Sequence, residues 1–108
     1  MKQVRLNRRL TLEDPSPSPD GAGGFVQNWV PLGRIWAQVN PTSAREVGDR
    51  SITRYRIFVR RAPVGAPGRP RPDQRFRDGA RVYHIEAVTE TPAEPRLLMC
   101  YAYEEVGG

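Results

Sequence analysis

The sequence contains almost none of the residues that most often build metal and redox sites. Its 108 residues contain one cysteine, one histidine and one lysine. A single cysteine excludes a disulfide framework within the chain and a cysteine-based metal site. One histidine and one cysteine cannot supply the ligand cluster that a structural or catalytic zinc requires. We therefore expect no metal and no cofactor.

Catalytic groups are equally scarce. A nucleophile needs a base and an orienting group, and the one histidine, His84, lies inside a strand-like pattern, which is typical of an exposed or edge residue. The glycine-rich run 21–24 lacks the lysine and the following helix of a phosphate loop. We predict that the protein is not an enzyme. The acidic pairs fall in polar segments or near the terminus, where we expect solvated side chains: Asp14 with Asp20, Glu46 with Asp49, and Glu104 with Glu105.

Long hydrophobic runs are absent as well. No apolar stretch approaches the roughly 18 residues of a membrane span, and residues 1–5 lack the apolar segment of a signal peptide. We expect no membrane partner and synthesis in a reducing cytoplasm. Cys100 stands in an apolar run, which predicts a buried thiol.

Proline and glycine are abundant, with 11 and 10 residues, and no stretch shows the periodicity of an amphipathic helix. The length suits a single domain, residues 1–108. Two segments, 14–24 and 62–73, are so rich in proline and glycine that we predict long loops. Two tryptophans, four tyrosines and three phenylalanines are enough to supply a core.

Alternating apolar and polar residues predict strands in segments 4–12, 55–59 and 82–88. Asp78-Gly79 between two such segments predicts a tight β-hairpin turn. Five to seven short strands without helices indicate an all-β fold, a small antiparallel barrel or sandwich with long Pro/Gly-rich loops. The expected core residues are Leu6, Leu10, Trp36, Tyr55, Ile57, Val82, Ile85 and Leu97.

One polar segment stands apart, because Val47 and Ile52 are its only large apolar residues. Ser43 and Glu46 have the spacing of a capping box for one short helical turn. Nothing in the segment can anchor it to a core, so we predict a mobile loop. Its residues are Pro41, Thr42, Ser43, Ala44, Arg45, Glu46, Val47, Gly48, Asp49, Arg50, Ser51, Ile52 and Thr53.

The formal net charge is +5, and arginine supplies nearly all the positive charge. Arg54, Arg56 and Arg60 are separated by multiples of two residues and so share one face of a strand, with Phe58 between them. Such a face is found in small basic OB-like or SH3-like barrels that bind nucleic acid, where aromatics stack on bases and arginines hold phosphates. We favour the alternative, in which these arginines are solvated or pair with acids of a neighbouring strand or subunit, because one aromatic is a sparse stacking platform.

An ordered set of landmarks covers nearly the whole chain. It runs from Leu6–Leu12 through Asp20-Gly21, Trp29, the Trp36–Pro41 segment and Arg45-Glu46 to the Tyr55–Ile57 strand, Phe76–Val88 and a closing hydrophobic strand. In this order the chain resembles the head–tail joining proteins of siphophage-type viruses, also called head completion or stopper proteins.

The resemblance implies a structural virion protein at the head–tail junction, assembled in the host cytoplasm. Its β-barrel subunit would form a homo-oligomeric ring, a dodecamer, with portal and adaptor proteins above and tail terminator and tail proteins below. In that family the loop corresponding to residues 41–53 faces the DNA channel and helps to close it, without reading the DNA sequence. Whether the particle is a phage, a prophage product or a gene transfer particle stays open.

Overall fold

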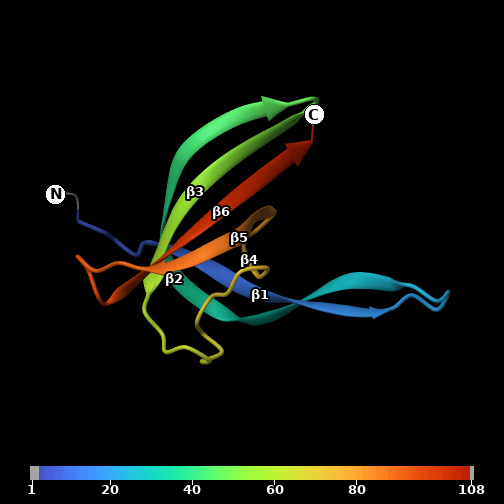
Figure 1. Ribbon diagram of the computed structural model, residues 1–108, viewed down its shortest axis with the longest axis horizontal. Helices are drawn as coiled ribbons and strands as arrows, with labels where there is room; N and C mark the ends of the chain where they lie inside the picture. The colour runs from blue at the N-terminus through green and yellow to red at the C-terminus, as the bar shows by residue number, and fades with distance from the viewer. Residues whose placement is uncertain (1–2, 108) are drawn as a thin grey trace.

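The computed structural model describes residues 3–107, which form six β-strands and no helix (Figure 1). The strands join into a closed barrel in the order β1-β2-β3-β6-β5-β4, and every neighbouring pair is antiparallel. This confirms the predicted all-β antiparallel fold. The strands are β1 (Arg8–Pro19), β2 (Phe25–Val47), β3 (Arg50–Arg60), β4 (Arg75–Asp78), β5 (Arg81–Glu90) and β6 (Leu97–Gly107).

Two extensions project from the barrel, which gives the molecule extents of 53 × 35 × 22 Å (Figure 1). Both arise because β2 is 23 residues long and changes partner at Ala37, which is aligned with Arg8 of β1 and with Val59 of β3. The first extension, the arm (residues 13–33), is a two-stranded hairpin of β1 and β2. The second, the wing, consists of β2 after residue 40, the facing part of β3, and the end of β6.

The proline-rich segment 14–24 is not the predicted loop. Pro15, Pro17 and Pro19 are aligned with residues of β2, and the connecting turn covers only residues 20–24. Prolines two residues apart point their ring nitrogens to the same edge of a strand. The missing N–H groups therefore all lie on the edge of β1 that faces away from β2, where no ladder bond is needed. The ladder between β1 and β4 ends at Glu13, before the first proline.

The segment 41–53 is not a loop either. Its two halves form a regular hairpin, aligned from Ala44 with Thr53 to Val47 with Arg50, and a two-residue turn at Gly48-Asp49 joins them. The predicted capping box is wrong, because the Glu46 carboxylate accepts a hydrogen bond from Ser51 across the hairpin at 2.8 Å. Backbone pairing with β3, and of β3 with β6, orders a segment that has almost no apolar side chains.

Both tight turns place glycine where the backbone requires a positive φ. Gly79 has φ 61° and follows Asp78, so the hairpin predicted at this dipeptide is present between β4 and β5. Gly48 has φ 64° at the same position of the wing turn. Only the first central residue has a positive φ in each case, which is the pattern of a type II′ turn. The other predicted loop, 62–73, contains no strand.

The barrel encloses one apolar core, in which Phe76 and Tyr83 are the largest fully buried side chains. Among the expected core residues, Leu10, Tyr55, Ile57 and Ile85 are buried. Cys100 is also buried, as its apolar surroundings predicted. The core consists of Leu10, Leu12, Ala37, Tyr55, Ile57, Val59, Phe76, Tyr83, Ile85, Leu98, Cys100 and Ala102.

The other four expected core residues are not in this set. Trp36 is 52% exposed, and Leu6, Val82 and Leu97 are half-buried. Leu6 precedes β1, and the remaining three are the immediate neighbours of Ala37, Tyr83 and Leu98, which face inward instead. Successive residues of a strand point to opposite faces, so an assignment that is wrong by one position exchanges inside and outside.

Candidate assembly surfaces

The wing tip presents a polar, electrically balanced surface. Every residue from 41 to 50 is exposed. Arg45 and Arg50 balance Glu46 and Asp49, so residues 41–53 carry no net formal charge. Arg50 forms an ion pair with Glu105 of β6 at 2.5 Å, which connects the hairpin to the third strand of the wing. The residues predicted to line a channel thus lie together at the end of a β-sheet that extends from the barrel (Figure 1).

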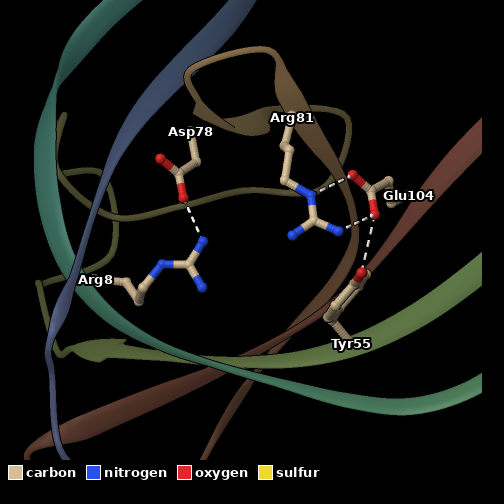
Figure 2. A network of polar contacts seen from close by, with 5 residues as sticks. All are labelled: Arg8, Tyr55, Asp78, Arg81 and Glu104. Atoms are coloured by element: carbon tan, nitrogen blue, oxygen red, sulfur yellow. Dashed lines mark hydrogen bonds and ion pairs between the residues drawn. The ribbon is translucent and has the colours of Figure 1, made fainter.

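A polar network lies where the wing joins the barrel (Figure 2). The Tyr55 hydroxyl of β3 donates a hydrogen bond to Glu104 of β6 at 2.9 Å. Arg81, at the start of β5, donates to both oxygens of the same carboxylate at 3.0 and 3.2 Å. Burial, followed by the hydrogen bond to Glu104, raises the pKa of Tyr55 to about 12. The network ties two strands of the wing, β3 and β6, to the β4–β5 hairpin.

Arg8 and Asp78 connect the other side of that hairpin to β1 through a hydrogen-bonded ion pair. This bond raises the pKa of the Arg8 guanidinium. Arg8 interrupts the apolar pattern at the start of β1, and the structure shows why it is there. The short β4–β5 hairpin is held by charged contacts on two sides, to β1 and to β6.

Two buried carboxylates were missed by the sequence analysis. Glu104 was expected to be solvated, but it is 9% exposed because β6 continues past it and its side chain points inward. Glu13 is 7% exposed and pairs with Arg75 at 2.6 Å and Arg77 at 3.2 Å. The Arg75 guanidinium also lies 4.0 Å from the centre of the Trp29 ring, so it connects the arm to the barrel. Glu13 is aligned with Arg75 of β4, but this pairing joins distant parts of the chain, so no local sequence signal identified the buried acid.

The three arginines of β3 lie on the outer face, as their spacing predicted, but they have different surroundings. Arg54 forms an ion pair with Glu86 of β5. Arg56 is exposed and lies opposite Tyr101 of β6, which is 37% exposed. Arg60, at the end of β3, lines a surface groove with Trp36 and Leu6. They do not form one continuous arginine surface.

The arm exposes apolar side chains instead of covering them. Phe25 is 72% exposed, and Val26, Val30 and Leu32 are between 40% and 48% exposed. At its tip, Asp20 accepts hydrogen bonds from the backbone N–H groups of Ala22 and Gly24 at 2.8 and 3.0 Å. These bonds lower the pKa of Asp20. An apolar, exposed hairpin with one ordered carboxylate is a typical contact element between proteins.

Chemical sites are not evident in the described part of the chain. No group of three or more histidine, cysteine, aspartate or glutamate side chains comes together within residues 3–107. His84 lies on β5 with its ring 5.1 Å from that of Tyr103, and burial, with Arg75 nearby, lowers its pKa. No helix in this part of the chain has the length and apolar character needed to cross a bilayer.

Comparisons with known proteins agree with this picture. The structure matches a chain from the virion of a native gene transfer agent particle with a TM-score of 0.85 and 44% identity, over 98% of this chain and 100% of that one. It also matches the solution structure of protein SF1141 from Shigella flexneri 2a, with a TM-score of 0.66, 21% identity and 96% of both chains, a likeness of fold alone. No curated protein sequence matches the chain.

A family model described as phage head completion protein matches residues 1–106, which is the family indicated by the order of the sequence landmarks. The arm, the wing and the charged network at the barrel end are therefore surfaces of an assembly protein, and no catalytic role is required of them. The chain belongs to the phage head completion protein family, whose members are structural proteins and not enzymes.

Proposed function

We propose that the protein forms a ring in the connector between head and tail, with portal and adaptor proteins on one side and the tail terminator on the other. The observation that carries this proposal is the likeness, across the whole chain, to a protein of a gene transfer agent virion. The shape of the subunit supports it. A compact barrel with two β-sheet extensions offers different surfaces to neighbours in the ring and to proteins above and below.

The wing tip, residues 41–53, is the element that closes the DNA channel in this proposal. Its zero net charge gives the tip no long-range attraction for phosphates, so closure is steric and independent of DNA sequence. Its attachment to β3 and β6 gives it the stiffness of a sheet. Copies from many subunits would meet at the ring axis, where each tip gains contacts that a single subunit lacks.

The test shortens the wing without disturbing its register. Arg45 to Ile52 are removed, and an Asn-Gly turn joins Ala44 to Thr53, which are aligned partners in the hairpin. We expect the barrel to fold and the chain to enter particles, while filled heads lose DNA or fail to acquire tails. The matched control keeps the full hairpin and replaces only Gly48-Asp49 by Asn-Gly. Shortened particles that retain DNA and transfer it normally would show that the wing does not close the channel.

Nucleic-acid binding by the outer face remains the second candidate, and one observation favours it. Arg56 lies opposite the partly exposed Tyr101, so β6 adds an aromatic side chain to this face. Replacing Arg54, Arg56 and Arg60 by glutamine distinguishes the two functions. Tight binding of free oligonucleotides that is lost in the triple variant, with a steep salt dependence, would favour this candidate. A connector subunit should bind free DNA weakly and without sequence preference.

A further inference from the structure

The tip of the arm combines one carboxylate with exposed apolar side chains. Residues 14–33 contain two aspartates and no arginine or lysine, although the whole chain has a net charge of +5. Asp14, at the base, is bound by Arg71 at 3.1 Å and Gln74 at 2.8 Å. Asp20 is therefore the free charge of the tip, where it adjoins Phe25 and Val26.

A groove elsewhere on the same chain has the complementary chemistry. Apolar walls are supplied by Leu6, Ile35 and Trp36, and positive charge by Arg34, Arg60 and Arg61. Arg61 is paired with Glu90 at 2.9 Å. Within residues 3–107, Arg34 and Arg60 have no carboxylate within ion-pair distance.

The groove continues past Arg60 to Arg96, whose guanidinium is paired with Glu94 at 3.3 Å. The two acids next to the groove, Glu90 and Glu94, are thus matched by Arg61 and Arg96. Arg34 and Arg60 leave an excess of positive charge beside an aromatic ring that is 52% exposed. An acidic and apolar segment is the ligand that such a surface fits.

The tip cannot reach the groove of its own chain. Arg34 lines the groove, and the arm's β2 strand is extended from Phe25 to this residue. At about 3.3 Å per residue, roughly ten residues of strand place the tip about 30 Å away. Figure 1 shows the arm leading straight away from the barrel and from the loop that contains Ala62. Any contact between the two surfaces must be made between copies.

We propose that the arm tip of one copy binds in the arginine-lined groove of the next copy, with Asp20 against Arg60 and Arg34 and with Phe25 against Trp36 and Leu6. This inference rests on the proposed ring and identifies its subunit interface. The contact joins two different surfaces, so each copy gives one arm and receives one, and repetition by rotation closes a ring. The prolines on the outer edge of β1 keep that edge from pairing with other strands.

Cysteine cross-linking in purified particles tests the contact. Ala22→Cys places a thiol at the exposed tip, and Ala62→Cys places one at the groove. The native Cys100 is buried with a pKa raised to about 12, so it does not compete. Mild oxidation of the double variant should give a ladder of bands at multiples of the chain mass. The matched control combines Ala22→Cys with Ala80→Cys, an exposed residue of the β4–β5 turn, and should give no ladder.

The outcomes separate this inference from the proposed function. If the chain is present in particles but the double variant gives no ladder, or links the tip to a different protein, the inference is wrong and the connector role stands. If purified particles lack the chain, both are wrong. A second variant, Asp20→Asn, keeps the hydrogen-bond acceptor of the turn but removes its charge. It should lower the cross-linking yield several-fold, whereas an unchanged yield would contradict the role of the carboxylate.

Discussion

Tyr55 of β3 donates a hydrogen bond to Glu104 of β6 across the strand pair at the base of the wing, at 2.9 Å. Both residues are at most 9% exposed, and Arg81 binds the same carboxylate from β5. One contact thus connects the core of the barrel to the part of the sheet that leaves it. Its removal should affect the stability of the wing and of the barrel together.

The Tyr55→Phe variant removes the hydroxyl and keeps the ring, which packs edge-on against Tyr83 at 4.9 Å. We expect the free energy of unfolding to fall by about 1–2 kcal/mol, because the Glu104 carboxylate loses a buried hydrogen-bond donor. Urea denaturation measures the change. Tyr101→Phe is the control on the outer face of β6 and should shift stability by less than about 0.5 kcal/mol. Equal effects of the two variants would contradict the importance of the Tyr55 contact.

Stability should fall at alkaline pH. Tyr55 has a folded pKa of about 12 against an ordinary value of 10.0, so the unfolded chain releases this proton first. The resulting stability is complete below about pH 10 and is lost as the pH rises towards 12. Cys100 acts in the same direction between its ordinary 9.0 and about 12, because burial raises its pKa. Denaturation at a series of pH values should show this decline, with a smaller slope above pH 10 in Tyr55→Phe.

The Glu13→Gln variant tests the buried ion pairs between β1 and β4. It leaves Arg75, which is 13% exposed, without its charged partner. We expect a loss of about 3 kcal/mol, which is typical of breaking one side of a buried pair. Asp14→Asn is the matched control, since its partner Arg71 is 66% exposed and such pairs contribute at most about 1 kcal/mol. A Glu13 variant as stable as the Asp14 variant would show that the burial of this pair has no energetic consequence.

The prolines of β1 should protect the arm against unwanted strand pairing. Replacing Pro15, Pro17 and Pro19 by threonine restores three N–H donors on the outer edge, beside a hairpin that already exposes Phe25. We expect unchanged circular dichroism but self-association at lower protein concentration, measured by light scattering. The control replaces Ser16 and Ser18 by threonine and adds no donor to that edge. Equal solubility of both variants would argue against a protective role of the prolines.

Much of the fold could be predicted because the strand signals are local. The alternation around Tyr55 and Ile57 and the Asp78-Gly79 turn each specify their own structure. The face of a strand was harder to predict, and Leu97 illustrates why. β6 is apolar on both faces around Met99 and Tyr101, so no alternation indicates that Leu98 points inward. Trp36 was expected in the core because of its large apolar side chain. The small Ala37 faces inward instead, at the crowded point where the β1–β2 and β2–β3 ladders meet.

The two extensions could not be predicted from segments taken one at a time. Three prolines usually exclude a strand, and residues 41–53 offer no apolar pattern. Residues 14–19 form a strand because residues 25–30 supply hydrogen bonds on one edge. Residues 41–53 are ordered because their two halves pair with each other and the second half also pairs with β6. The sequence did place the candidate channel residues together, and it missed Glu13 and Glu104 because their burial depends on arginines that are distant in the chain.

The continuity of β2 has a mechanical consequence. One strand runs from the arm to the wing and is bonded to β1 along residues 25–37 and to β3 along residues 37–47. A pull on the arm along this direction loads the two ladders in shear, so that many hydrogen bonds resist at once and none can open alone. A load applied to the arm would therefore reach the wing tip without first unravelling the barrel.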